Sequence, residues 1–197
     1  MELCEEKRRL RKAVRARAPS AAERAAQSER LCHRLLRWPQ YQRAECLAAY
    51  VPLPHEANIL PVLEDALHRG KRLLLPRVDA ADMTFHETDS LAALCPGAYG
   101  VLEPSADAPR VALREASLLL IPLEAVDDHG RRLGKGGGYY DRVLAESRGF
   151  RLGIALTHQV VPRVPAGKTD QPLDGWITPD SQWMIEKARE QHGYQEE

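Results

Sequence analysis

The residues of this chain best suited to chemistry are concentrated in one glycine-rich stretch, residues 128–144. The stretch reads Asp-His-Gly-Arg-Arg-Leu-Gly-Lys-Gly-Gly-Gly-Tyr-Tyr-Asp-Arg-Val-Leu. Glycines let backbone N–H groups approach an anion closely, and Arg131, Arg132 and Lys135 supply positive charge for phosphate oxygens. From Tyr139 onward the stretch predicts a helix, whose first turn also favours an anion. Its Asp141 is a hard oxygen ligand suited to Mg²⁺.

These features predict phosphate binding, and the alternative is a flexible turn with solvated arginines. The stretch is not a Walker A loop, because no Gly-Lys-Ser/Thr follows its glycines. It does not have the spacing of the dinucleotide-binding fingerprint either. An apolar run at residues 118–121 precedes it. We therefore expect the local order strand, loop, helix.

Residues 130–142 closely resemble the signature of the 5-formyltetrahydrofolate cyclo-ligase family, also called methenyltetrahydrofolate synthetases. Weaker matches follow the family's order over about residues 5–180: Lys7 with Arg11, residues 50–56, residues 99–104, and Thr169-Asp170 followed by Asp174. The resemblance implies a single domain over residues 1–197, ending in a polar tail at 186–197. It also implies a fold like that of the isomerases and CoA transferases.

The resemblance implies that Lys7 and Arg11 reach the phosphates of ATP. The sequence alone leaves other roles open for this basic run, namely a solvated helix face or an arm for nucleic acid. The other nucleotide-binding residues that the resemblance implies lie in the glycine loop: Arg132, Leu133, Gly134, Lys135, Gly136, Gly137, Gly138, Tyr139 and Tyr140. Among these we expect Lys135, Arg132 and Tyr139 to serve the reaction directly, and Tyr140 to contribute more to packing.

Folate binding is implied for Val51, Glu56, Tyr99 and Tyr139. A carboxylate such as that of Glu56 suits the edge donors of a 2-amino-4-oxopteridine. An aromatic ring at Tyr99 would flank the folate pocket. The residues just before Glu56 depart from the family's more common Gly-Glu-Ile pattern, and we assign no role to His55.

The resemblance implies that Asp141 and Asp170 hold Mg²⁺, with Asp174 as a weaker alternative. Two carboxylates plus water are a usual way to hold Mg²⁺ beside a triphosphate. Thr169 stands where the family often has His or Asn, and Gly137 stands where some relatives carry Lys. Lys135 must then serve without a second lysine in the loop.

The implied reaction is the ATP- and Mg²⁺-dependent conversion of 5-formyltetrahydrofolate to 5,10-methenyltetrahydrofolate, with ADP and phosphate as the other products. In the family's route the formyl oxygen attacks the γ-phosphorus and gives an imidate-like phosphate. N10 then closes the ring as phosphate departs. Such phosphoryl transfer depends mainly on positioning and charge neutralisation.

Composition agrees with one enzyme domain. The chain has 197 residues, a formal net charge of zero and 44% hydrophobic residues, so no global attraction to nucleic acid or membrane is expected. No apolar run is long enough to span a membrane, and the N-terminus does not resemble a secretory signal. The four scattered cysteines fit neither a zinc site nor a redox pair. We expect a cytoplasmic monomer whose partners are small molecules.

Alternating helix and strand patterns predict an α/β fold, namely a three-layer, Rossmann-like domain with a largely parallel central sheet. Such sheets bind ligands beyond the carboxyl ends of their strands. Helices are predicted over 3–17, from a Ser20–Glu23 capping box to about 38, from an Asn58 cap to Gly70, and from Tyr139. The predicted strands are 46–51, 72–75 (stopped by Pro76), 83–86, 118–123 and 151–156.

Two other classes of function remain open. One is a nucleic-acid or regulatory binder that uses the basic helix, for which a steep salt dependence would be diagnostic. The other is a different enzyme of phosphate-bearing ligands on a similar scaffold, such as a sugar-phosphate isomerase or acyl-CoA transferase. Dependence on Mg²⁺ and ATP separates that enzyme from a cyclo-ligase.

Overall fold

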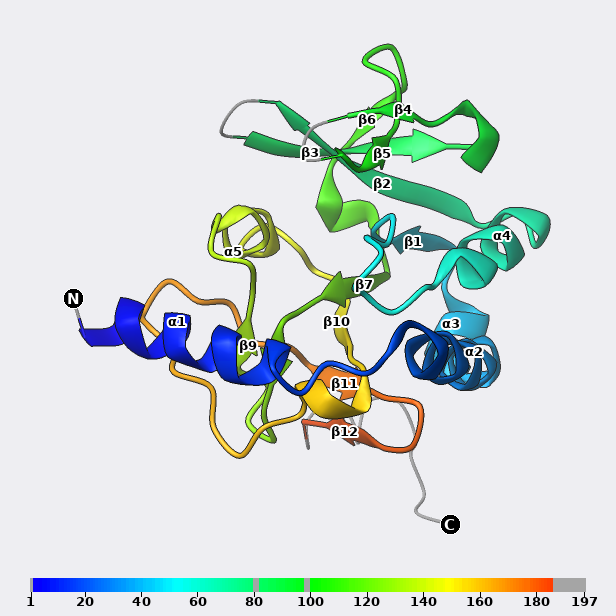
Figure 1. The fold of residues 1–197 in the computed structure, drawn as a ribbon. Helices are drawn as coiled ribbons and strands as arrows, with labels where there is room; N and C mark the ends of the chain where they lie inside the picture. The colour runs from blue at the N-terminus through cyan, green and yellow to red at the C-terminus, as the bar shows by residue number, and fades with distance from the viewer. Residues whose placement is uncertain (1, 80–81, 98–99, 186–197) are drawn as a thin grey trace.

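A mixed sheet of eight strands forms the centre of the protein in a computed structural model (Figure 1), which describes residues 2–79, 82–97 and 100–185. Its strand order is β12-β11-β10-β7-β1-β2-β3-β6. The strands are β1 (Cys46–Ala48), β2 (Arg72–Asp79), β3 (Asp82–Thr88), β6 (Arg110–Val111), β7 (Leu118–Pro122), β10 (Phe150–Ile154), β11 (Gly175–Ile177) and β12 (Gln182–Met184). Strands β11, β10, β7, β1 and β2 are parallel neighbours, whereas β12, β3 and β6 are antiparallel.

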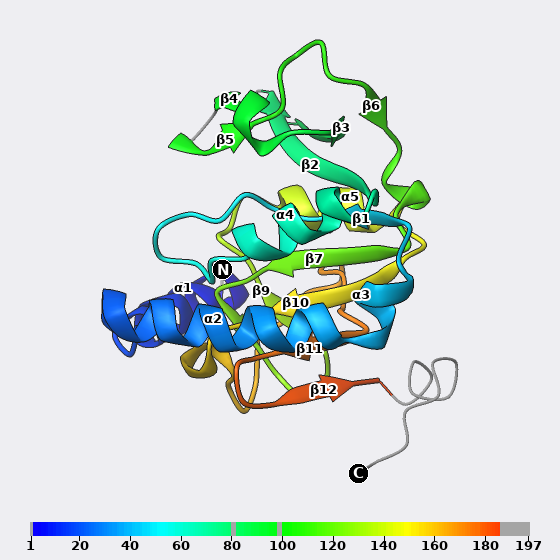
Figure 2. The same cartoon turned by 90° about the vertical axis from the view of Figure 1, so that its right-hand side faces the viewer.

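Helices cover both faces of this sheet (Figures 1 and 2). On one face lie α2 (Ala21–Arg37), α3 (Pro39–Arg43) and α4 (Leu60–His68). On the other face lies α5 (Tyr139–Leu144). This arrangement confirms the predicted three-layer α/β fold with a largely parallel sheet.

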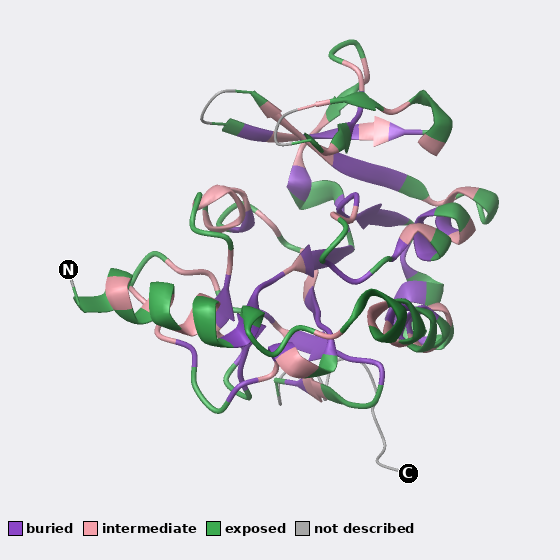
Figure 3. Cartoon of the chain, in the orientation of Figure 1, coloured by how far each residue is buried: buried purple, intermediate pink, exposed green. Residues whose placement is uncertain are grey.

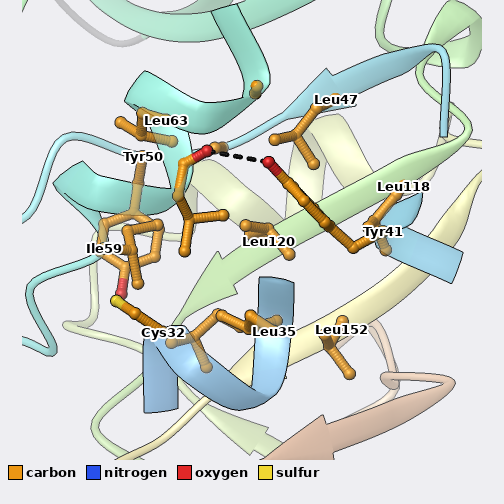
Figure 4. Packing of buried hydrophobic residues seen from close by; sticks show 14 of the residues in the cluster. Cys32, Leu35, Tyr41, Leu47, Tyr50, Ile59, Leu63, Leu118, Leu120 and Leu152 are labelled. Atoms are coloured by element: carbon orange, nitrogen blue, oxygen red, sulfur yellow. Dashed lines mark hydrogen bonds between the residues drawn. The ribbon is translucent and has the colours of Figure 1, made fainter. Parts of the chain in front are cut away.

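The central strands bury both of their faces, as expected for a parallel sheet between helices (Figure 3). Successive side chains along a strand point to opposite faces of the sheet, so they pack into different hydrophobic cores. Leu118, Leu120 and Leu152 pack toward α2 and α4 (Figure 4). Leu119 and Ile121 pack toward α5.

The N-terminal helix α1 (Glu2–Arg15) lies beside a small hairpin at the end of the sheet. The hairpin consists of β8 (Ala125–Val126) and β9 (Arg132–Leu133). Val14 of α1 is buried against Ala125 and Leu133 of the hairpin. This third, smaller core fixes α1 near the glycine-rich stretch.

Short elements complete the described structure. A second two-stranded pair consists of β4 (Cys95–Pro96) and β5 (Leu102–Glu103), and single turns of 3-10 helix are η1 (Leu91–Ala93), η3 (Leu113–Glu115) and η4 (Thr157–Gln159). Every helix among the described residues is too short or too polar to cross a membrane. The predicted polar tail at 186–197 lies outside the described residues.

Several predicted helix boundaries are confirmed. The capping box of α2 is present: the Ser20 hydroxyl accepts from the Glu23 N–H, and the Glu23 carboxylate accepts from the Ser20 N–H. Helix α4 ends before Gly70, which has φ +70°. Its beginning differs by one residue, because Ile59 is the N-cap and Asn58 Oδ1 accepts instead from the Leu60 N–H.

The prediction that Pro76 ends the second strand was wrong. Strand β2 continues to Asp79, paired with β3 along its whole extension. Leu74 accepts a hydrogen bond from the Ala49 N–H on the β1 side. Pro76, two residues further on, faces that same side, but β1 pairs only with residues 72–74. The N–H that proline lacks would therefore have no strand partner there.

Two other strand predictions need correction. The first strand, predicted over 46–51, is only Cys46–Ala48, because the chain then leaves the sheet toward Glu56. The order strand, loop, helix is also incomplete. The β8–β9 hairpin intervenes between β7 and the glycine loop. Each strand of this hairpin has only two residues, too few to show a periodicity in the sequence.

Candidate functional site

The glycine loop, residues 134–138, follows directly from β9 and leads into α5. Gly136 and Gly138 have φ of +104° and +66°, a region that favours glycine. Gly138 is also the N-cap of α5. A Cβ at Gly134 would lie 2.9 Å from Nη1 of Arg132, and one at Gly137 would lie 2.8 Å from the ring of Tyr139. Backbone conformation thus favours glycine at 136 and 138, and a side chain at 134 or 137 would have to displace Arg132 or Tyr139.

Arg132 projects from β9 into the region between the loop and α5. Its side chain is only 3% exposed, and its Nη2 donates to Oδ1 of Asp141 at 2.8 Å. The guanidinium carbon lies 5.5 Å from the ring centroid of Tyr140, within cation–π range. Its Nε is buried and has no hydrogen-bond partner within the described part of the chain. A buried, unpaired guanidinium donor suits an anionic ligand.

Helix α1 brings the two basic residues of the predicted N-terminal pair to this loop. Arg11 donates from Nε to the carbonyl of Gly134 at 2.8 Å. One turn earlier, Nζ of Lys7 lies 2.7 Å and 2.5 Å from the two carboxylate oxygens of Asp170. Residues 163 positions apart in the sequence are thus joined at one site.

A third ion pair joins the glycine loop to the segment after β1. Lys135 Nζ lies 2.7 Å from Oε1 of Glu56, whose side chain is 7% exposed. Oε2 of Glu56 accepts from the Leu53 N–H at 2.8 Å. Glu56 also borders a cavity of about 570 Å³ between α2 and residues 52–61. Burial and the nearby charge of Glu56 raise the pKa of Tyr140 well above its ordinary value, although Arg132 opposes this rise.

The two predicted metal ligands are close together. The N–H of Gln171, which follows Asp170, donates to Oδ1 of Asp141 at 3.3 Å. Both carboxylates remain partly exposed, at 24% for Asp141 and 18% for Asp170. Burial raises the pKa of Asp170, but the Gly167 N–H and Lys7 outweigh it, and the net shift is downward. Two accessible carboxylates at one place fit the oxygen ligation of Mg²⁺.

Other acidic residues are occupied elsewhere. Asp127 is fully buried, and its oxygens accept from the N–H groups of His129, Arg131 and Val164 and from Nε of Arg131. It lies beside Asp128 and His129 in a group that resembles a metal site, but its four donors make it a structural carboxylate. Arg131 therefore points away from the glycine loop.

Asp174, the alternative metal ligand, is also engaged elsewhere. Its Oδ2 accepts from the N–H of Arg151 at the start of β10. That position is at the amino ends of the parallel strands, whereas Glu56 follows the carboxyl end of β1.

The remaining predicted residues differ in how much of their side chain can meet a ligand. Val51 and Leu133 are buried in core clusters, so they can offer mainly backbone groups. Tyr139 is half-buried and carries Arg142 over its ring at 5.0 Å. Tyr140, expected to contribute to packing, packs against the core on the α5 face of the sheet, and its ring also contacts the guanidinium of Arg132. Tyr99 lies outside the described residues.

Sequence reasoning missed Glu124. It follows β7, its side chain is 6% exposed, and its two oxygens accept from Nε and Nη2 of Arg15 at 2.9 Å and 3.0 Å. Burial raises the pKa of Glu124, yet Arg15 and the charges of His55 and Lys135 bring it below its ordinary value. An acid inside an otherwise apolar Leu-Glu-Ala-Val run was the available signal.

Comparison with known proteins shows the family to which this chain belongs. The family model described as the 5-formyltetrahydrofolate cyclo-ligase family matches residues 4–179, which include every residue of the site. The chain belongs to the 5-formyltetrahydrofolate cyclo-ligase family. It is therefore an enzyme of the ligase class.

Relatives of the cyclo-ligase family match over most of the chain. The 5-formyltetrahydrofolate cyclo-ligase of Escherichia coli strain K12 is 28% identical over 176 residues, which cover 86% of this chain and 97% of the relative. The cyclo-ligase of Mycolicibacterium smegmatis is 32% identical over 144 residues, 68% of this chain and 73% of the relative.

A solved structure, that of 5,10-methenyltetrahydrofolate synthetase from Aquifex aeolicus, superposes with a TM-score of 0.83 at 32% identity. The superposition covers 91% of this chain and 93% of that one. The fold of that synthetase thus extends over nearly the whole chain.

Proposed function

We propose that this protein converts 5-formyltetrahydrofolate to 5,10-methenyltetrahydrofolate in the cytoplasm, with conversion of ATP to ADP and phosphate and with Mg²⁺ as the required ion. One observation carries the proposal: each of three predicted phosphate-binding cations is paired with a carboxylate predicted to bind metal or folate. The pairs are Lys7–Asp170, Arg132–Asp141 and Lys135–Glu56. Relatives are named for the conversion of 5-formyltetrahydrofolate to 5,10-methenyltetrahydrofolate, and a site with these paired charges is suited to that reaction.

In the proposed function, these three ion pairs separate when ligands bind, and each charged side chain then contacts a ligand instead. Asp141 and Asp170 would hold Mg²⁺, and Arg132 and Lys7 would then be available for phosphate oxygens. Folate takes the carboxylate of Glu56, which frees Lys135 for ATP. The ion pairs keep the charges of the ligand-free site balanced, so that no buried charge is left alone.

Mg²⁺, when bound, neutralises charge on the phosphates beside Asp141 and Asp170. The protein's own groups do the remaining work. The loop N–H groups and Arg132, with its unpaired Nε, hold the transferred phosphoryl group. Lys135 neutralises charge that develops on the oxygen between the β- and γ-phosphates.

The folate is held from the other side. Glu56 accepts from the edge donors of the pterin, and the cavity beside it leads between α2 and residues 52–61. This places the formyl group toward the glycine loop, because Lys135 contacts Glu56 directly. The formyl oxygen is thereby aligned with the γ-phosphorus.

The bond changes balance as follows. The formyl oxygen bonds to the γ-phosphorus, and the bond from that phosphorus to the ADP oxygen breaks. N10 then bonds to the formyl carbon and loses its proton, and the carbon–oxygen bond breaks. The formyl oxygen thus leaves as part of inorganic phosphate.

Isotope transfer tests this route. With 5-formyltetrahydrofolate labelled with ¹⁸O in the formyl group, one ¹⁸O per turnover is expected in the released phosphate, measured by mass spectrometry. Unlabelled phosphate formed together with product would refute phosphorylation of the formyl oxygen. Incubation of labelled folate without ATP is the control, and it should give no labelled phosphate.

A further inference from the structure

The pair formed by Glu124 and Arg15 lies at the base of the glycine loop. Glu124 is a buried carboxylate that the proposed chemistry does not use. Its side chain holds Arg15 of α1 through both oxygens. Its backbone N–H donates to the carbonyl of Leu133, immediately before Gly134, at 2.7 Å. One residue therefore connects α1 with the strand from which the loop begins.

Three residues of α1 form one stripe that faces this region. Lys7, Arg11 and Arg15 are spaced four apart, which places them on one side of a helix. Lys7 contacts Asp170, Arg11 contacts the Gly134 carbonyl, and Arg15 contacts Glu124. Only the last of these pairs involves no residue predicted to bind a ligand.

The residues of this stripe behave differently when ligands bind. In the proposed function Lys7 must leave Asp170, and Arg11 turns toward phosphate. Burial of Val14 turns one face of α1 toward the hairpin, but apolar contacts are non-directional and restrain the exact rotation of the helix only loosely. A bidentate guanidinium–carboxylate pair is directional and does set it. The Arg15–Glu124 pair can therefore persist while the other contacts exchange.

We propose that Glu124 is a positioning residue for ATP: through Arg15 it fixes the rotation of α1, so that Lys7 and Arg11 face the glycine loop. This inference rests on the proposed function and adds a residue to it. The nearby charges of Lys135 and His55, which act on Glu124, make the carboxylate part of the same electrostatic environment. Glu124 itself touches no substrate in this account.

Steady-state kinetics of four variants test the proposal, with the KM values for ATP and 5-formyltetrahydrofolate measured separately. Glu124→Gln removes the charge at nearly constant shape. It should raise the ATP KM about tenfold, as expected for the loss of a charge-assisted contact, and leave the folate KM within about twofold. Arg15→Met should be more harmful, because it leaves a buried carboxylate unpaired. The double variant should recover part of that loss.

Glu5→Gln is the matched control, because Glu5 pairs with Arg8 and Arg9 on the exposed side of the same helix. It should leave both KM values unchanged. Thermal unfolding of each variant confirms that it is folded. A folded Glu124→Gln enzyme with an unchanged ATP KM, or with equal increases in both KM values, would overturn the positioning role. Wild-type enzyme that forms product without ATP would instead overturn the proposed function.

Discussion

Replacement of Glu56 by glutamine should move the affinities for the two substrates in opposite directions. The carboxylate of Glu56 has two partners: Lys135 at 2.7 Å and the Leu53 N–H at 2.8 Å. Glutamine can still accept from Leu53 through its amide oxygen, but it carries no charge for Lys135. The substitution therefore removes one interaction and preserves the local turn.

The expected magnitudes follow from exposure. Lys135 is 42% exposed, so its pair with Glu56 is partly screened and contributes about 1 kcal/mol. Freeing Lys135 should lower the Kd of a non-hydrolysable ATP analogue with Mg²⁺ by about fivefold. For folate, the loss of a charge-assisted hydrogen bond of about 1.5–3 kcal/mol should raise the Kd roughly 10- to 150-fold.

Isothermal titration calorimetry of each ligand alone gives these constants directly. Lys135→Met is the matched variant: it should weaken the ATP analogue but bind folate at least as well as the wild type, since Glu56 then has no competing cation. If Glu56→Gln weakened both ligands equally, or left the ATP analogue unaffected, exchange of the Lys135–Glu56 pair would be refuted.

Three further predictions concern single residues. Asp141→Asn should lower kcat and raise the Mg²⁺ concentration needed for half-maximal activity, since one hard ligand is lost; wild-type kinetics across a Mg²⁺ titration would remove Asp141 from the metal site. Asp127→Ala should lower the free energy of unfolding by about 3 kcal/mol, because four donors to a fully buried carboxylate lose their acceptor; a thermal midpoint within about 2 °C of wild type would contradict this. Burial lowers the pKa of His158 below 6.5; the charges of Arg17 and Arg24 reinforce this shift, and Glu124 opposes it. As the pH decreases below about 6.5, His158 is therefore protonated in the unfolded chain before it is protonated in the folded protein. The contribution of neutral His158 to the free energy of unfolding falls over that range. Unfolding by urea between about pH 7 and pH 5 should therefore show a smaller loss of stability in His158→Gln, and an identical loss would refute the assignment.

Local signals in the sequence were sufficient for the parts of the fold that depend on neighbouring residues. The capping box at Ser20, the closing Gly70 and the helix from Tyr139 are each specified within a few positions. The strand prediction failed at Pro76. A proline is tolerated in a strand where no neighbouring strand lies on the side of its missing N–H, and this depends on where β1 ends. Strand β6 pairs with the distant β3, whereas β11 and β12 are a hairpin of three-residue strands that joins the sheet through the distant β10.

The candidate site, like the fold, could be predicted from the sequence only where it depends on neighbouring residues. The glycine loop and its cations could be predicted from the sequence, because their residue types and spacing are typical of phosphate binding. The partner of each cation was not, because Lys7–Asp170 and Lys135–Glu56 join distant segments. Glu124 was missed for a further reason: its place in an apolar run was a signal of burial, but its partner Arg15 lies far away in the sequence.

The most direct test of the central claim is the growth of the methenyltetrahydrofolate absorption band when purified protein is mixed with 5-formyltetrahydrofolate and Mg²⁺, with and without ATP. The account predicts growth of the band only with ATP, with one ADP released per product formed. Product at the same rate without ATP would contradict it. So would absence of product from folded protein that binds both ATP and 5-formyltetrahydrofolate.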